Sequence, residues 1–171
     1  MSQRKTAFGA HADERTRVLI CGSLPGERSL AERRYYAHPS NRFWHLTGAL
    51  LGCDLVSLGY HQRIERLLDG GIGLWDVVKS ARRIGSGDAA IRDHQPNLLA
   101  PFAQGLPRLR AIAFNGAKAA SIGRGQLGQD RLTLVDLPSS SAAHASLSLA
   151  EKMSRWLVLR DFLDSCLPPS A

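Results

Sequence analysis

The sequence contains few of the residues that build metal centres or disulfide frameworks. Its 171 residues include 3 cysteines, Cys21, Cys53 and Cys166, and no two of them form a CxxC pair. This count and spacing argue against a disulfide scaffold, a zinc ribbon and an iron–sulfur cluster. The histidines give no close ligand pair either, since His38 and His45 are separated by a full seven positions. We therefore expect no metal ion and no cofactor.

Long apolar runs are also missing. No stretch approaches the roughly 18 apolar residues that a membrane helix needs, and the N-terminal "MSQRKTAFGAHADERTR" has no apolar segment typical of a secretory signal. We expect a cytoplasmic protein with no membrane contact. The length predicts one domain over residues 15–165, with residues 1–14 as a mobile polar tail and 166–171 as a C-terminal tail. We expect this domain to act as a monomer.

Acidic residues are outnumbered. Lysine and arginine total 22 against 15 for aspartate and glutamate, which gives a formal net charge of +7 and a pI near 9.9. Such a surplus suits a polyanionic partner such as a nucleic acid. The arginines are spread along the chain, so solubility alone is the alternative explanation.

Three segments have the pattern of a short buried strand that runs into a turn. They are "RVLICGSLPG", "PRLRAIAFNG" and "RLTLVDLPSSS". Helical spacing follows in "SNRFWHLTGALLG", "HQRIERLLDGG", "AKAASIGR" and "SLAEKMSRWLVLRDFL". Strands that alternate with helices predict an α/β fold with a parallel sheet covered by helices on both sides.

Local signals refine these elements. Ser40 is placed to cap the first of the helices, the pair Gly70 and Gly71 to end the second, and Ser148 with Glu151 to form a capping box on the last. The stretch "GIGLWDVV" fits either a strand or a helix start. "RRIGSGDAAIRDHQPN" is expected to be a polar connection with a helical turn.

The ligand crevice of such a sheet lies beyond the carboxyl ends of its strands. "GSLPG", "FNGAK" and "LPSSSAAH" end strands at that edge, and "GLWDV" can supply a fourth segment. The glycines of "GSLPG" allow close approach of a ligand to the backbone. This turn lacks both GK[ST] and GxGxxG, so it is neither type of nucleotide-binding loop. The phrase "YYAHPSNRFW" follows it and is expected to line the same crevice.

The order "GSLPG", "YYAHPSNRFW", "GIGLWDVV", "FNGAKA" and "LPSSS" resembles the uracil-DNA glycosylase superfamily, from about Val18 to the last helix. The "HPxNxFW" phrase is shared by its mismatch-specific and hypoxanthine-specific branches, and the full order is most similar to the hypoxanthine-DNA glycosylase branch. The resemblance implies a three-layer α/β/α sandwich with a central, mostly parallel sheet. It also implies hydrolysis of the N-glycosidic bond of a flipped-out deaminated base, hypoxanthine favoured, in base excision repair. The implied partner is damaged double-stranded DNA, with single-stranded DNA as an alternative substrate.

The resemblance implies a set of base-pocket residues. Tyr36 matches the aromatic position on which the extruded base stacks, which is worth about 1–3 kcal/mol and tolerates many bases. Its alternative is a core aromatic residue. Backbone groups of Gly22, Ser23 and Leu24 are candidates for hydrogen bonds to the base edge. Asp76 resembles a position that faces the base in related branches, and its alternative is a helix N-cap.

The catalytic group departs from the commonest family pattern. Many members carry Asp or Asn at the third position of the first turn, where this chain has Leu24. In hypoxanthine-type relatives the role is attributed to the asparagine that corresponds to Asn41. We expect its oxygen to orient a water while its NH2 donates elsewhere. A neutral amide suffices because the oxocarbenium-like sugar demands little of the nucleophile. The alternative is that Asn41 bonds the backbone at a helix start.

"LPSSSAAHASLS" resembles the loop that contacts phosphates and inserts a wedge into the duplex. Hydroxyls and backbone amides of such a loop fix the register on DNA. The wedge fits poorly, because Ala143 is small and His144 replaces the asparagine usual in the branch; His144 is alternatively a capping or surface histidine. The DNA-binding residues predicted are Pro25, Gly26, Lys118, Ser139, Ser140, Ser141, Ala142, Ala143 and His144.

Two other functions stay open at this point. One is a uracil- or thymine-specific mismatch glycosylase on the same fold, against which the apolar Leu24 argues. The other is a non-catalytic DNA-binding module. A serine hydrolase is disfavoured because the chain has no GxSxG elbow.

Overall fold

The computed structural model describes residues 3–128 and 131–163 and is built on a parallel sheet. Four strands lie in the order β3-β2-β6-β7, and each neighbouring pair is parallel. Their bounds are β2 Val18–Gly22, β3 Ile72–Asp76, β6 Ala111–Asn115 and β7 Thr133–Leu137. All residues of β2 and β6 are buried, as expected for central strands covered on both faces.

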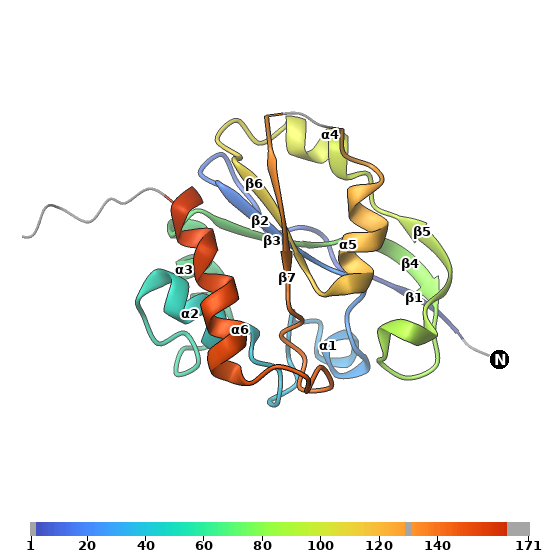
Figure 1. Cartoon of the computed structure of the whole chain (residues 1–171). Coiled ribbons are helices and arrows are strands. Elements are labelled where there is room, and N and C mark those ends of the chain that lie inside the picture. Colours follow the sequence, from blue (N-terminus) through green and yellow to red (C-terminus); the bar gives the residue numbers. More distant parts are fainter. Residues whose placement is uncertain (1–2, 129–130, 164–171) are drawn as a thin grey trace, which may run out of the picture.

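Helices cover both faces of this sheet, as Figure 1 shows. One face carries α2 Phe43–Leu51, α3 Tyr60–Asp69 and α6 Leu149–Trp156, which continues into the 3₁₀ helix η2 Leu157–Phe162. The other face carries α4 Leu99–Gln104 and α5 Ala117–Arg124. The short α1, Glu27–Glu32, follows β2. The predicted three-layer α/β/α architecture is therefore confirmed.

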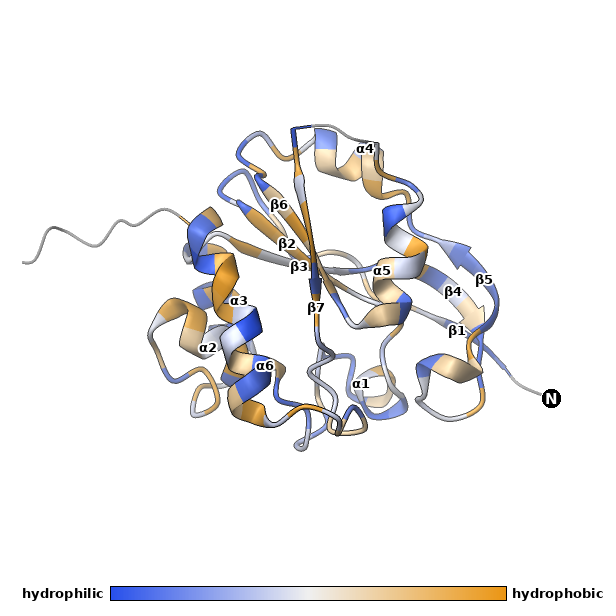
Figure 2. Cartoon of the chain, in the orientation of Figure 1, coloured by the Kyte–Doolittle hydropathy of each residue, from blue (hydrophilic) through white to orange (hydrophobic). Residues whose placement is uncertain are grey.

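The side chains of β2 alternate between two hydrophobic clusters, one on each face of the sheet. Val18 and Ile20 belong to the cluster beneath α2, α3 and α6, whereas Leu19 and Cys21 belong to the cluster beneath α4 and α5. Successive side chains of a strand point to opposite faces, so one apolar run fills both layers. The hydropathy colouring of Figure 2 shows this apolar centre in β2 and β6.

A second, antiparallel sheet lies beside the first. Its order is β1-β4-β5, with bounds β1 Arg4–Thr6, β4 Val78–Arg82 and β5 Arg92–Pro96, and the 3₁₀ helix η1 Asp88–Ala90 lies between its last two strands. Every residue of β5 is exposed, and this strand is hydrophilic in Figure 2. The sequence predicts only a polar connection over β5, because an exposed strand shows no apolar alternation.

The N-terminal segment differs from the prediction of a mobile tail over residues 1–14. Arg4–Thr6 pair with β4, and His11 forms an isolated bridge with Leu74. The tail prediction is thus wrong for these residues, whose backbone groups are held by strands. The C-terminal tail predicted over 166–171 lies outside the described residues. Within the described ranges, no helix combines the length and apolar character needed to cross a bilayer.

Some of the helix caps predicted from the sequence are present and one is not. Helix α3 ends at Gly70, and the capping box of α6 is present, with Ser148 Oγ accepting from the Glu151 amide at 3.2 Å. The ambiguous "GIGLWDVV" contains strand β3. The cap predicted at Ser40 is wrong, because its hydroxyl instead lies 2.7 Å from His38 Nδ1.

Candidate active site

A cleft of about 900 Å³ opens at the carboxyl ends of the parallel strands. The segments that follow β2, β6 and β7 line it, together with the end of β3, so residues far apart in the sequence meet there. Every residue predicted for the site lies in this lining. They are Gly22, Ser23, Leu24, Pro25, Gly26, Tyr36, Asn41, Asp76, Lys118, Ser139, Ser140, Ser141, Ala142, Ala143 and His144.

The cleft also contains polar residues that the sequence analysis did not select. Asn115 closes β6, Asp88 begins η1, and Ser86 lies in the loop before η1. The position of Asn115 at the end of a predicted strand was a usable signal, since that edge is where ligands bind. Within the part of the chain that the structure describes, no three His, Cys, Asp or Glu side chains gather into a metal-binding group.

Tyr36 is held as a rigid aromatic wall. Its ring stacks on Phe43 with a centroid distance of 3.9 Å and an interplanar angle of 10°. Trp44 Nε1 donates to the Tyr36 carbonyl at 3.2 Å. The backbone of Tyr36 has φ +52°, a left-handed conformation that costs energy in a bulky residue and is common at functional sites. Tyr36 therefore extends the core aromatics and lines the cleft at once.

Gly22 keeps the floor of the cleft open. It pairs in register with Asp76 across β2 and β3. A Cβ atom at Gly22 would lie 2.8 Å from Asp76 Oδ1 and 2.9 Å from Tyr36 Oη, both closer than atoms approach without strain. Only glycine allows the acid and the ring to share this space.

Asp76 is a buried acid at the end of β3. Its side chain is 3% exposed, and Oδ2 has no hydrogen-bond partner among the described residues. Burial, and next the negative charge of Asp88, raise the pKa of Asp76 to about 7. The alternative of a helix N-cap is wrong, because strand β4 begins two residues later.

A hydrogen-bonded chain joins four side chains of the cleft. Tyr36 Oη and Ser140 Oγ each accept from Asn115 Nδ2, at 3.2 and 2.9 Å. Ser140 Oγ in turn donates to Asn41 Oδ1 at 2.8 Å. The same oxygen of Asn41 accepts from the backbone N–H of Phe43 at 3.0 Å, which satisfies a donor at the start of α2.

These hydrogen bonds give the Asn41 side chain the opposite orientation to the one predicted. We expected its oxygen to hold a water, but the two lone pairs of that oxygen already accept from Phe43 and Ser140. The NH2 group is the part of the amide left to meet a ligand. The alternative of a helix-start residue is also correct, because the oxygen serves α2 while the amide lines the cleft.

The serine loop after β7 has two kinds of serine. Ser140 is only 1% exposed, so its bonded hydroxyl does not fit the predicted contact with phosphate. Ser139 and Ser141 are more open, and their hydroxyls accept from the amides of Ser141 and Ala143, both at 3.2 Å. Lys152, which the sequence analysis missed, is buried behind the loop and donates to the Ser141 carbonyl at 3.0 Å. Burial, and next the charge of Arg42, lower the pKa of Lys152.

The "GSLPG" turn is held by residues between strands β4 and β5. Arg83, which is 1% exposed, donates to the carbonyls of Leu24 and Pro25. Ser23 Oγ donates to Asp88 Oδ1 at 2.5 Å. The side chain of Leu24 packs into the core beneath α5, so the turn presents backbone groups to the cleft and no acid or amide at this position.

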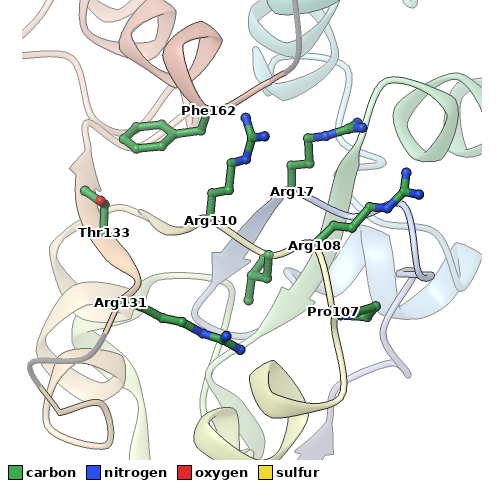
Figure 3. Close-up of a pocket in the computed structure, with 8 residues that line it drawn as sticks. Arg17, Pro107, Arg108, Arg110, Arg131, Thr133 and Phe162 are labelled. Atoms are coloured by element: carbon green, nitrogen blue, oxygen red, sulfur yellow. The ribbon is translucent and has the colours of Figure 1, made fainter.

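A second depression, of about 600 Å³, lies at the amino ends of the strands (Figure 3). Arg17 and Arg110 directly precede β2 and β6, and Arg108 and Arg131 complete its basic lining. Figure 3 shows these side chains together with Phe162. This end of the sheet holds none of the predicted site residues.

The chain is similar to known proteins over most of its length. The family described as "Uracil DNA glycosylase superfamily" matches residues 8–162. A hypoxanthine DNA glycosylase of Methanosarcina barkeri (strain Fusaro) is 38% identical over 153 residues, which is 90% of this chain and 96% of that protein. One of Methanosarcina acetivorans is 40% identical over 152 residues, which is 89% of this chain and 95% of that protein.

A solved structure shows the same fold. It is a solution NMR structure of a Methanosarcina acetivorans protein named as a candidate uracil DNA glycosylase. It superposes with a TM-score of 0.81 at 37% identity and covers 92% of this chain and 97% of its own. With a family match over nearly all described residues and relatives of this similarity, the chain belongs to the uracil DNA glycosylase superfamily.

Proposed function

We propose that this protein is a DNA glycosylase that releases hypoxanthine from damaged DNA, as the first step of base excision repair. The relatives named hypoxanthine DNA glycosylase span nearly the whole chain at 38% and 40% identity. The observation that carries the proposal is the single hydrogen-bonded chain from Tyr36 through Asn115 and Ser140 to Asn41. It joins an aromatic platform to an amide, which are the parts needed to hold a base and place a nucleophile.

Base recognition begins with removal of the nucleotide from the duplex, because the target bond is inaccessible inside the stack. The extruded base stacks on Tyr36, whose other face is supported by Phe43. The support fixes the ring before the base arrives, so little ordering is needed on binding. Gly22 leaves room for the base edge beside Asp76.

Asn41 then positions the water that attacks the sugar. Its NH2 group donates to the water oxygen and holds it facing C1′, while the fixed oxygen prevents rotation of the amide. The bond between C1′ and N9 breaks with its electron pair on the base, and the water adds to the cationic sugar and loses a proton to solvent. A neutral amide suffices because the electrophile is strong.

DNA is held by the rim of the cleft. Lys118, at the start of α5, and the hydroxyls of Ser139 and Ser141 are placed to contact phosphates. Exposed Ala143 and His144 lie next to them, and Ala143 is too small to fill the gap left by a base. We favour double-stranded DNA as the substrate and the monomer as the acting form, because the cleft is complete within one chain.

A panel of duplexes containing hypoxanthine, uracil, xanthine or a thymine mismatch tests the proposal. We expect free hypoxanthine and an abasic product without strand cleavage. Asn41→Ala should abolish release but also removes an oxygen from the start of α2, which costs about 1 kcal/mol of stability. Asn41→Asp keeps both hydrogen bonds and serves as the fold-preserving control. Release of uracil or thymine alone would favour the mismatch enzyme, and salt-sensitive binding without any release would favour a non-catalytic module.

A further inference from the structure

Asp76 combines a position in the cleft with deep burial and an unsatisfied oxygen. It lines the cleft beside Gly22 and Tyr36, yet its side chain is 3% exposed and Oδ2 is unpartnered within the described residues. An unsatisfied buried carboxylate is costly, whereas a carboxylic acid tolerates burial far better. Oδ1 is the oxygen that lies beside Gly22 in the cleft, so a ligand is expected to meet Asp76 through Oδ1 while Oδ2 stays buried.

The charged and titratable groups around Asp76 also favour its neutral form. Asp88 on η1 contributes a negative charge. Cys21 on β2 and Tyr36 before α2 are buried, and burial raises the pKa of both, so they supply no charge. The positive charge of Arg83 lowers the pKa of Asp76, but its guanidinium already donates to backbone carbonyls, including those of Leu24 and Pro25. Tyr35, a near neighbour, is likewise neutral, because burial raises its pKa.

We propose that Asp76 meets the flipped base as a neutral carboxylic acid and protonates the carbonyl oxygen of the leaving base. This inference rests on the proposed function and deepens it. A carboxylic acid presents an O–H donor and a C=O acceptor side by side. With its proton on Oδ1, the oxygen beside Gly22, the acid can donate to O6 on the lactam edge of hypoxanthine, while Oδ2 stays buried as the uncharged carbonyl oxygen. A carboxylate would offer acceptors only and would repel the negative charge that develops on the base.

The proton balance of the step closes without any further reactant. As the C1′–N9 bond breaks, its electron pair moves onto the base and the charge reaches O6. The proton of Asp76 passes to O6, so the base leaves as a neutral tautomer. The attacking water loses one proton, and the Asp76 carboxylate regains one from solvent. The sum is hydrolysis to free hypoxanthine and an abasic sugar.

Base binding strengthens the effect. A base in the cleft displaces water from Asp76 and deepens its burial, which disfavours the carboxylate further. The contribution of Asp88 can be changed by mutation. Its charge raises the pKa of Asp76, and its own Oδ1 accepts a hydrogen bond from Ser23. Replacing Asp88 by asparagine keeps an acceptor for Ser23 and removes the charge.

The test is the pH profile of single-turnover hypoxanthine release, from about pH 5.5 to pH 9, for wild type, Asp76→Asn, Asp76→Leu and Asp88→Asn. The wild-type rate should fall by up to tenfold per pH unit above its midpoint. Asp76→Asn keeps a donor and an acceptor that do not titrate, so its rate should be about 10–100-fold lower and independent of pH over this range. Asp76→Leu should lose more than about 100-fold throughout. Asp88→Asn should move the midpoint to lower pH.

The outcomes separate the two proposals. If wild type releases no hypoxanthine at any pH, the proposed function fails, and the role of Asp76 fails with it. If wild type is active but Asp76→Asn keeps the same slope, or Asp76→Leu keeps full activity, the glycosylase function stands and the acid role is wrong. Circular dichroism of each variant shows whether a loss of rate comes from unfolding.

Discussion

The hydroxyl of Ser140 donates a hydrogen bond of 2.8 Å to the side-chain oxygen of Asn41. The two residues lie 99 positions apart in the sequence, in the loops after β7 and before α2. Asn115 completes the arrangement by donating to the same hydroxyl at 2.9 Å. The orientation of the amide that faces the cleft is therefore set in part by a loop whose other two serines, Ser139 and Ser141, are more exposed.

Ser140→Ala should slow base release without weakening DNA binding. Loss of one buried hydrogen bond to Asn41 is worth about 1–1.5 kcal/mol, which is roughly a tenfold lower rate. Single-turnover kinetics at saturating enzyme measure the rate, and titration of enzyme measures the affinity. The matched control is Ser139→Ala, which should lower affinity and leave the saturated rate unchanged. Equal effects of the two variants on both quantities would contradict the assignment.

Gly22→Ala should block the cleft in a protein that remains folded. The added methyl would lie 2.8 Å from Asp76 Oδ1 and 2.9 Å from Tyr36 Oη, and both side chains are confined, because Tyr36 stacks on Phe43 and Asp76 is buried. We expect at least a hundredfold loss of activity, since small displacements of positioning groups have effects of about this size. Gly125→Ala is the control, because a Cβ there meets nothing within 4 Å. An active Gly22→Ala protein would show that the base enters elsewhere.

Tyr36→Ala should weaken binding of the extruded base by about 1–3 kcal/mol, because the stacking surface is lost. Tyr36→Phe keeps the ring and removes only the hydroxyl that accepts from Asn115 at 3.2 Å. Its effect should be several-fold smaller. Binding to a duplex with a non-cleavable hypoxanthine analogue measures both. If the two variants bound equally weakly, the hydroxyl rather than the ring would be the main contact.

The stability of the protein should fall as the pH rises through the acid range because of Asp76. Its folded pKa, about 7, lies above the ordinary value of 3.8. Between these values the folded state keeps a proton that the unfolded state releases, so the free energy of unfolding decreases with pH and levels off above about pH 7. Asp76→Asn removes this contribution, which is at most about 4 kcal/mol.

Urea unfolding of wild type and Asp76→Asn at about pH 4.5, 6 and 8 measures this difference. The variant should gain stability relative to wild type as the pH rises. A difference that stays constant over this range would show that Asp76 has the same pKa in the folded and unfolded states.

Lys118→Gln should reduce the salt dependence of DNA binding, whereas Arg108→Gln should not. Lys118 lies in the cleft and Arg108 at the opposite end of the strands, as Figures 1 and 3 show for the surrounding elements. Removal of one phosphate contact lowers the slope of log K against log salt by about 1. Binding isotherms at several salt concentrations measure the slope. A larger change with Arg108→Gln would place the DNA on the arginine-lined depression.

The parallel sheet was predictable because its signal is local and repeated. Three apolar runs each end in a turn and lead to a helical pattern, and the burial of β2 and β6 on both faces makes those runs continuous. The antiparallel sheet was not predictable in this way. Strand β5 is exposed at every residue, so its sequence is that of a polar loop, and pairing with β4 alone defines it.

The cleft shows the same division. The residues that line the cleft were predictable because strand ends and the "YYAHPSNRFW" phrase mark them. The contacts between these residues were not predictable. The direction of the Asn41 amide depends partly on Ser140, and the support from Arg83 and Lys152 depends on carbonyls of Leu24 and Ser141, all more than ten residues away in the sequence. A sequence shows which side chains can bond, and the packing of elements decides which of them do.

The bond from Asn41 to Phe43 also limits how the sequence can diverge over generations. A mutation that deletes the side-chain oxygen at position 41 destabilises the start of helix α2 and also removes the amide from the cleft. Aspartate alone has the same shape with oxygens in the same places, and a negative charge there favours the helix start. Descendants of this gene that keep helix α2 intact are therefore steered toward an amide or an acid at this position.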